Sequence, residues 1–388
     1  MRSTAPTEHA PFVAPWDVPL PDRMRSLAGG ETSVAYFYEQ ADDSTFRYRI
    51  HNMTQVLASS GGDVSASYFF LADLHRLQEI AELADMLVIC RTRYDQRVNH
   101  LINAFRRQGK RVLFDVDDLV FDTDYGHLVQ WTLDQDLRSP AVWDHWFAYS
   151  SRLGTTLQLC DGTITTNDCL AERIRDYADV PVAIVPNYMN REQLAVSEPI
   201  FAARRQEKVG EDGTIRLGYF SGSPSHNRDF AIITPSLETA MEADPRLELV
   251  VAGYIESGPL LARFGDRVEQ HPFCDFVTLQ KLVGSVAFNL VPLQHNAFTN
   301  CKSELKYFEA AIVGTQTIAS PTYTYGKAIR HGENGYLSQA HQWVDRIRGA
   351  VDDLASFDAM AERSHDDALA KYGWFNQREC ILAALGLE

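Results

Sequence analysis

The feature that most constrains the fold is a series of short, largely apolar segments separated by helical stretches. Five such segments lie in the first half of the chain: SVAYFY (33–38), MLVIC (86–90), RVLFDV (111–116), GTITT (162–166) and VAIVPN (182–187). Strands with continuous apolar runs are typical of a parallel sheet with helices on both faces. The first half therefore predicts a doubly wound α/β domain.

A second series follows a polar, charged segment at 197–213, and its predicted strands are 215–220, 247–253, 286–292 and 315–320. A chain of 388 residues is long for one hydrophobic core, which favours two domains. The predicted division is an extended N-terminal arm over 1–30, a first Rossmann-like domain over 31–200, a second over 201–370, and a C-terminal helix over 371–388 that could pack back on the first domain.

Composition narrows the class of protein. The formal net charge of −16 argues against a general nucleic-acid binder. No run of about 18 apolar residues predicts a membrane span, and the first 30 residues lack the apolar region of a signal peptide. The six cysteines form no CxxC pair, which favours a reduced, cytoplasmic chain without a structural metal. Local basic stretches leave open a peripheral contact at the inner face of a membrane, and the sequence does not indicate an oligomeric state.

The segment NCKSELKYFEAAIVG (300–314) predicts a helix with an unusual polar face. Lys302, Lys306 and Glu309 form one stripe of that face. The two lysines repel each other at i,i+4, and Lys302 in the first turn opposes the helix dipole. With Asn300 as the N-cap, a diphosphate bound at this helix N-terminus would relieve both penalties. The segment therefore predicts a diphosphate site.

A second predicted phosphate site follows the strand at 215–220. The turn SGSPSHNRDF contains small and hydroxyl-bearing residues whose N–H groups can approach an anion closely. Cationic side chains follow at the expected helix start. The donor-site residues predicted from the two segments are Ser221, Gly222, Ser223, His226, Arg228, Asn300, Lys302, Ser303 and Lys306.

Charged side chains also lie at strand ends in the first domain. Asp115, Asp117 and Asp118 end the strand at 111–116. One hypothesis makes Asp115-x-Asp117 a metal-binding DxD motif, and the other places Asp117 or Asp118 beside an acceptor hydroxyl. Arg47 and Arg49 follow the first strand and are expected on the acceptor side of a cleft, where they would meet phosphate or an acidic acceptor.

These segments together resemble GT-B glycosyltransferases of family 4 (group 1). The resemblance covers roughly residues 80–340. It rests on the 300–314 segment and on LGYFSGSPSHNRDF (217–230), FCDFVTLQKLVGSVAFNLVPL (273–293) and HGENGYL (331–337). It implies two Rossmann-like domains that face each other across a cleft. It also implies retaining sugar transfer from a UDP- or GDP-sugar to a saccharide or lipid-linked acceptor, without an obligatory metal, in polysaccharide or glycoconjugate biosynthesis.

The resemblance also assigns residues. Glu309 matches the second glutamate of the family's E-x7-E motif and would bind donor hydroxyls, whereas Cys301 stands where the first glutamate is expected. The expected nucleobase loop contains Phe273, Cys274 and Phe276. Asn187 closes the last strand of the acceptor domain.

Three alternatives stay open at this point. The missing first glutamate leaves open a catalytically silent subunit that binds sugar nucleotides. A GT-B epimerase or phosphorylase would share the fold. A metal-dependent transferase would use the DxD motif, although such an enzyme keeps its donor site in one domain and this chain predicts two.

Overall fold

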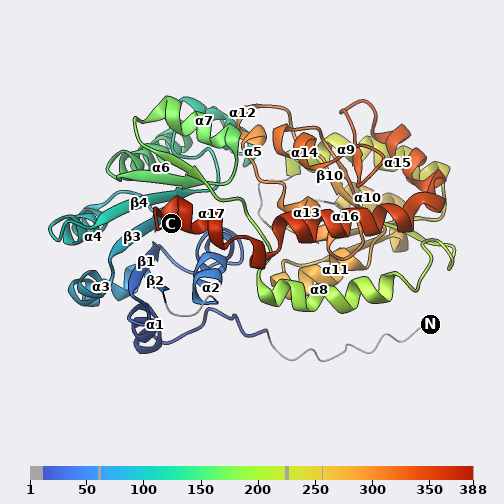
Figure 1. Cartoon of the computed structure of the whole chain (residues 1–388). Coiled ribbons are helices and arrows are strands. Elements are labelled where there is room, and N and C mark those ends of the chain that lie inside the picture. Colours follow the sequence, from blue (N-terminus) through green and yellow to red (C-terminus); the bar gives the residue numbers. More distant parts are fainter. Residues whose placement is uncertain (1–11, 60–62, 223–226, 256, 388) are drawn as a thin grey trace.

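The computed structural model describes residues 12–59, 63–222, 227–255 and 257–387. They form two lobes that lie side by side, each a six-stranded sheet flanked by helices (Figure 1). The strand orders are β2-β1-β3-β4-β5-β6 and β12-β11-β10-β7-β8-β9. Neighbouring strands in both sheets pair in parallel. The predicted pair of doubly wound sheets is confirmed.

The first sheet contains the five predicted strands and one that the pattern did not reveal. Its strands are β1 (Thr32–Tyr38), β2 (Val64–Phe70), β3 (Met86–Cys90), β4 (Arg111–Val116), β5 (Gly162–Thr165) and β6 (Val182–Ile184). Ser65 and Ser67 interrupt the apolar pattern of β2, yet both are buried. Ser65 Oγ donates to the carbonyl of Leu27, so its burial is satisfied by α1 beside it.

The first lobe contains seven α-helices in its described part, and two of them begin at side-chain caps. They are α1 (Leu20–Leu27), α2 (Asn52–Ala58), α3 (Leu77–Leu83), α4 (Gln96–Arg106), α5 (Gly126–Thr132), α6 (Pro140–Gln158) and α7 (Asp168–Tyr177). Asp95 accepts hydrogen bonds at the start of α4, and Asn167 does so at the start of α7. A π-helical turn over Arg47–His51 leads directly into α2, and such turns are frequent at functional sites.

The second lobe repeats the arrangement. Its strands are β7 (Ile215–Ser221), β8 (Leu247–Gly253), β9 (Val268–His271), β10 (Phe288–Val291), β11 (Gln316–Ala319) and β12 (Tyr336–Leu337). Its helices are α8 (Arg191–Arg204), α9 (Asn227–Ala243), α10 (Gly258–Phe264), α11 (Phe276–Gly284), α12 (Ala297–Asn300), α13 (Leu305–Ala311), α14 (Tyr323–Ala328), α15 (Trp343–Asp352) and α16 (Phe357–Tyr372).

The helix predicted over 300–314 is wrong in one respect, because it is two helices. Asn296, not Asn300, caps α12 through a capping box with Thr299. The carbonyl of Cys301 accepts from Asn167 Nδ2, and that of Lys302 accepts from Thr324 Oγ1. A helix continuing from α12 would use these carbonyls for its own ladder. The chain therefore breaks, and α13 begins only at Leu305.

The N-terminal arm is also more ordered than expected over its described part. Residues 20–27 form α1, whose Arg23 makes a buried ion pair with Asp73 at 2.7 Å. Before it, Trp16 is buried and packs on Phe276 of the second lobe, with ring centroids 6.0 Å apart. Burial of Trp16 and Arg23 explains why this segment is not an extended arm.

The chain passes between the lobes near Asn190 and returns near Gly373. After Asn190, α8 packs along α11 of the second lobe (Figure 1). After Gly373, α17 (Arg378–Leu385) lies against β6 and α2 of the first lobe. Arg111 Nη1 donates to the carbonyl of Leu385 at 2.9 Å, which holds this last helix in place. No helix in the described part of the chain is both long and apolar enough to cross a membrane.

Candidate active site

A cavity of about 600 Å³ lies between the lobes, at the carboxyl ends of strands from both sheets. Open α/β sheets bind ligands at this edge. The first lobe contributes Tyr38, Thr45, Arg47, Arg91, Asp117, Asp118, Trp146 and Tyr149 to its wall, among others. The second lobe contributes Gly222, Phe273, Cys274, Phe276, Asn289, Lys302, Ser303, Lys306 and Glu309. The cavity therefore brings most of the predicted donor and acceptor residues together.

On the first-lobe wall, Asp117 and Asp118 surround a single guanidinium. Arg91 Nη1 lies 3.0 Å from Asp117 Oδ1 and 3.4 Å from Asp118 Oδ2. Thr45 Oγ1 donates to the other oxygen of Asp117 at 3.0 Å. Arg91 has a φ of 35°, a left-handed conformation that costs an arginine of the order of 1–3 kcal/mol. The backbone strain is thus tolerated where it aims a cation at both carboxylates.

Behind that wall, Arg49 and Asp115 form a fully buried ion pair. Arg49 Nε and Nη2 lie 2.8 and 3.0 Å from the two oxygens of Asp115, and Nη1 donates to Asn187 Oδ1 at 3.1 Å. Burial raises the pKa of Asp115 to about 6, although Arg49 opposes the shift. Arg49 and Asp115 are absent from the cavity wall, which only Asn187 of these three reaches.

This pairing bears on the DxD hypothesis. Both carboxylate oxygens of Asp115 accept from Arg49, whereas Asp117 turns to Arg91 and Thr45. The two aspartates therefore do not present a shared pair of free oxygens to a divalent cation. Among the described residues, no group of three His, Cys, Asp or Glu side chains could hold a metal ion.

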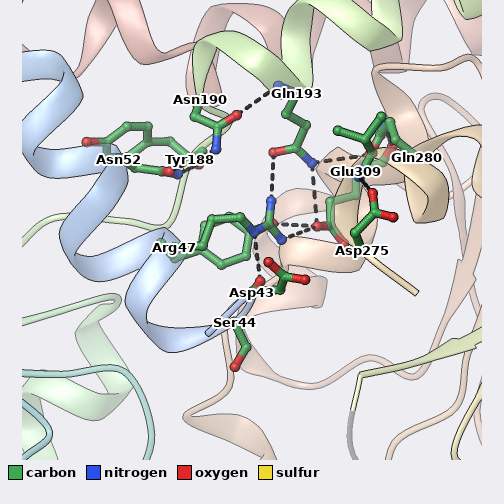
Figure 2. Close-up of polar contacts among 12 residues, drawn as sticks. Asp43, Ser44, Arg47, Asn52, Tyr188, Asn190, Gln193, Asp275, Gln280 and Glu309 are labelled. Atoms are coloured by element: carbon green, nitrogen blue, oxygen red, sulfur yellow. Dashed lines mark hydrogen bonds and ion pairs between the residues drawn. The ribbon is translucent and has the colours of Figure 1, made fainter. Parts of the chain in front are cut away.

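Glu309 of α13 is held by residues of the other lobe (Figure 2). Arg47 Nη2 lies 3.2 Å from Glu309 Oε1, and Tyr48 OH donates to the same oxygen at 2.5 Å. Gln193 Oε1 accepts from Arg47, and Gln280 Nε2 donates to the carbonyl of Glu309. Arg47 and Glu309 are 3% and 6% exposed, so Arg47 lies on a buried interlobe network rather than a solvated helix face.

Lys306, also in α13, lies on the second-lobe wall and has no ion pair with any residue that the structure describes. Its Nζ lies 5.2 Å from the centre of the Tyr219 ring. Burial lowers the pKa of Lys306 to about 8, Asp229 opposes the shift, and Lys302 adds to it. Beside it, Asn289 is buried and donates to the Lys306 carbonyl, while its Oδ1 has no partner among the described residues. This corner of the cavity therefore holds an ammonium group without an ion pair and a carbonyl oxygen without a donor among the described residues.

Lys302 and Ser303 lie in the break between α12 and α13, and both line the cavity. Lys302 Nζ is 3.6 Å from Asp118 Oδ1 of the first lobe and lies over the Phe298 ring at 4.6 Å. The lysine thus reaches across the cavity towards the carboxylates. It does so from a loop, because the helix N-terminus predicted at this position begins three residues later.

Other predicted donor residues are more scattered. Ser221 ends β7 and is buried beside Gly222. Arg228 pairs with Asp134 of the first lobe at 2.7 Å and lies over the Trp131 ring at 3.7 Å, away from the cavity wall. Asn300 is also absent from the wall, and its side chain accepts from the N–H of Tyr323. Ser223 and His226 lie outside the described residues.

The three residues of the expected nucleobase loop all line the cavity. Asp275 caps α11, which places Phe276 at its first position and buries it. Phe273 is 46% exposed and stacks on Tyr254, with ring centroids 5.5 Å apart. An aromatic pair at the rim of the cavity is a suitable surface for a planar base.

Several residues that line the cavity were not selected as site candidates from the sequence. Arg91 directly follows β3, so the same strand-end argument that selected Asp117 could have selected it. Trp146 and Tyr149 line the cavity from the middle of α6, a helix with no motif. Tertiary packing of α6, which contacts α5, brings them there, and no local sequence signal marks it.

The fold can be compared with solved structures. Sucrose-phosphate synthase from Thermosynechococcus elongatus matches 91% of this chain and 97% of its own, with 15% identity and a TM-score of 0.60. Anabaena HepE, in complex with UDP and glucose, matches 91% and 99%, with 12% identity and a TM-score of 0.59. WaaG, a glycosyltransferase involved in lipopolysaccharide biosynthesis, matches 91% and 100%, with 12% identity and a TM-score of 0.56.

No protein-family model matches the chain, and no curated protein matches it in sequence. At 10–15% identity the structural likeness establishes the fold alone. It extends over both lobes of the chain. The chain therefore has the GT-B fold, as the sequence motifs indicate.

Proposed function

We propose that this chain is a glycosyltransferase that moves a sugar from a nucleoside diphosphate sugar to a saccharide or lipid-linked acceptor held in the cavity between the lobes. Transfer retains the anomeric configuration and needs no metal ion. The GT-B fold and a cavity lined by both sheets support this proposal. HepE, with the same fold, was crystallised with UDP and with UDP-glucose.

The observation that carries the proposal is Lys306, a half-buried cation on the cavity wall that forms no ion pair with a described residue. Removing a charge from water costs free energy unless an opposite charge compensates it. A diphosphate beside Lys306 would supply that charge and would raise its depressed pKa. Lys302, one loop away on the same wall, adds a second cation for the same group.

The remaining wall residues then divide between donor and acceptor. The base stacks at the rim on Phe273, beside Tyr254. Glu309 and Asn289 lie on either side of Lys306 in the sequence and on the same wall, where they face the donor's hydroxyl groups. The first-lobe wall of Tyr38, Trp146 and Tyr149 receives the acceptor, because sugar rings pack well on aromatic side chains.

The ion pair between Lys302 and Asp118 suggests how the two substrates are coordinated. A diphosphate competes with Asp118 for Lys302, because it carries more negative charge than a carboxylate. Asp118 is thereby released on the acceptor side, where Arg91 still fixes its position. The donor thus prepares the carboxylate that orients the acceptor hydroxyl.

In the transfer itself, the acceptor oxygen bonds to the anomeric carbon while the bond from that carbon to the phosphate oxygen breaks. Attack from the face that the diphosphate leaves gives retention, and the acceptor proton passes to the departing phosphate. Lys302 and Lys306 stabilise the negative charge that grows on the leaving group. The protein supplies position and electrostatics, and no enzymic nucleophile is needed.

A second candidate function is nucleotide-sugar binding without turnover. Two observations favour it. Cys301, where the family motif has a glutamate, is fully buried, and one carboxylate oxygen of Glu309 is already occupied by Arg47 and Tyr48. A chain that binds but does not transfer would fit these contacts.

The decisive experiment is a thermal-shift screen against a panel of nucleotide sugars, followed by turnover assays with and without EDTA. Transfer predicts stabilisation by one donor and release of its nucleoside diphosphate in EDTA. Binding alone predicts the same stabilisation with no release. A loss of release in EDTA that Mn²⁺ restores would contradict the metal-independent proposal.

A further inference from the structure

Two cysteine thiols meet where α7 of the first lobe contacts the break between α12 and α13. The Sγ atoms of Cys169 and Cys301 are 3.5 Å apart, although the residues are 132 positions apart in the chain. Cys169 is the second residue of α7 and is partly exposed, whereas Cys301 is fully buried. The proposed transfer reaction uses neither thiol.

Two further contacts hold this junction together. Asn167 Nδ2, at the cap of α7, donates to the carbonyl of Cys301 at 2.8 Å. Lys327 Nζ of α14 lies 2.8 Å from Asp168 Oδ2, at the first position of α7. The thiols therefore face each other from segments that are tied on both sides. A disulfide needs about 2.0 Å between sulfurs, so closure requires a movement of only about 1.5 Å.

The two thiols differ in reactivity. The hydrogen bond with Cys301, together with the nearby cations Arg173 and Lys327, lowers the pKa of Cys169 to about 7 despite partial burial. The same hydrogen bond and burial raise the pKa of Cys301. The exposed thiol is thus the thiolate that meets an oxidant, and the buried one is placed to resolve it.

We infer that Cys169 and Cys301 are an oxidisable pair that joins the two lobes by a reversible disulfide. With hydrogen peroxide as the oxidant, the Cys169 thiolate attacks one oxygen, the O–O bond breaks, and a sulfenic acid and hydroxide form. The Cys301 sulfur then attacks the sulfenic sulfur, the S–O bond breaks, and water leaves with the thiol proton. The two sulfurs lose two electrons, and the peroxide is reduced to water.

The consequence for the cavity follows from chain position and rests on the proposed function. Lys302 directly follows Cys301 and lines the cavity. A disulfide would fix the segment of Lys302 to α7 and prevent the lobes from separating. Entry of the donor and release of the nucleoside diphosphate would then be slowed, while a thiol reductant would restore them.

The first test is chemical and uses the full chain. The protein is treated with hydrogen peroxide, alkylated and digested, and the peptides are compared by mass spectrometry with and without dithiothreitol. We expect a peptide pair linked through Cys169 and Cys301 that dithiothreitol separates. Cys169→Ser should abolish it. Cys380→Ser, at another partly exposed cysteine, should leave it unchanged. Absence of the linked pair in the unsubstituted chain would overturn the inference.

The second test measures whether the disulfide restricts the movement of the segment around Cys301. Hydrogen–deuterium exchange over residues 297–304 should slow at least tenfold on oxidation, in the unsubstituted chain and in Cys380→Ser but not in Cys169→Ser. Unchanged exchange in a chain that carries the disulfide would refute the inference that the disulfide restricts this segment. Turnover of a nucleotide sugar should fall at least tenfold and recover with dithiothreitol. If the disulfide and the slowed exchange are found but the reduced chain turns over no donor, the transferase proposal fails. The inference of a reversible disulfide between the lobes is then still supported.

Discussion

The two walls of the cavity satisfy their charges in different ways. On the first-lobe wall, Arg91 forms ion pairs with both Asp117 and Asp118, and behind that wall Arg49 pairs with Asp115. On the second-lobe wall, Lys306 has no ion pair with a described residue, and its pKa is depressed by burial. The carboxylates on the first-lobe side already have cationic partners, whereas Lys306 is complementary to an anion. A change at the buried Arg49–Asp115 pair should therefore affect folding, and a change at Lys306 should affect binding.

The largest expected effect comes from breaking the buried pair. Arg49→Met leaves the Asp115 carboxylate buried without its cation, which costs about 3–5 kcal/mol of unfolding free energy. The loss relative to the unsubstituted chain should grow as the pH rises above about 6, because Asp115 is protonated in both folded proteins below that pH and ionises above it only where Arg49 is present. Urea denaturation at pH 5 and pH 8 measures both effects.

A double variant and a surface pair serve as controls for Arg49. Arg49→Met with Asp115→Asn removes both charges and should recover part of the loss. Arg93→Met breaks the more exposed pair with Glu39 and should cost less than about 1 kcal/mol. Equal destabilisation by Arg49→Met and Arg93→Met would contradict the assignment of Arg49 as a structural residue.

The second-largest effect is expected at Lys306, the cation on the second-lobe wall that forms no ion pair with a described residue. Lys306→Met should weaken binding of a nucleoside diphosphate by about 10- to 100-fold, since a charge-assisted hydrogen bond contributes about 1.5–3 kcal/mol. Binding of the nucleoside alone should hardly change, and the unfolding free energy should not fall. Isothermal titration with UDP or GDP and with the matching nucleoside measures the difference, with the exposed Lys327→Met as the control. Equal losses for diphosphate and nucleoside would place Lys306 away from the phosphates.

The third effect is the pH dependence of the same binding. The pKa of Lys306 is about 8 in the empty cavity and should rise beside a bound diphosphate. Affinity should therefore be constant below about pH 7.5 and fall as the pH rises through 8 towards 10. Titrations from pH 6.5 to 9.5 check this, and Lys306→Met should flatten the profile. A decline of the same size in that variant would assign the titration to another group.

The smallest effect is expected at the ion pair that crosses the cavity. Asp118→Asn removes the competitor of the diphosphate for Lys302, a partly exposed pair that contributes about 0.2–1 kcal/mol. Diphosphate affinity should rise up to about fivefold, while transfer to the acceptor falls. Separate measurements of binding and of kcat test both halves. A fall in affinity would show that Asp118 does not compete for Lys302.

The sequence predicted the sheets well because their strands are buried on both faces. β1, β3 and β4 carry apolar residues at most positions, and such continuous runs are typical of a parallel sheet covered on both faces. β2 was missed because Ser65 and Ser67 interrupt the apolar run. The partners that satisfy the buried Ser65 hydroxyl, Leu27 and Ser33, come from other segments and cannot be predicted locally. The helix break at 301–304 was missed for the same reason, since Asn167 lies 134 positions away from the carbonyl that it captures.

Site residues could be predicted where they directly follow a strand. The ion pairs that they form with residues from distant segments could not be predicted. Asp117, Lys306 and Phe276 were all selected from sequence, and all line the cavity. The partners of Arg47 and Arg49 could not be read locally, because Glu309 and Asp115 come from distant segments. The stripe of Lys302, Lys306 and Glu309 was sound as a list of cavity residues. Its helical explanation applied only to the last two.

The double passage of the chain between the lobes defines how they can move. Met189 and Gly373 are paired where the two passages cross, and the N–H of Met189 donates to the carbonyl of Tyr372 at 2.9 Å. Two adjacent connecting segments permit rotation of one lobe relative to the other about the line that joins them, and they resist rotation about other axes. Donor and acceptor would therefore meet along one repeatable closing path. The thiols of Cys169 and Cys301 lie away from these connecting segments, at the α7 junction. A disulfide between them would therefore hold the two lobes in the closed arrangement.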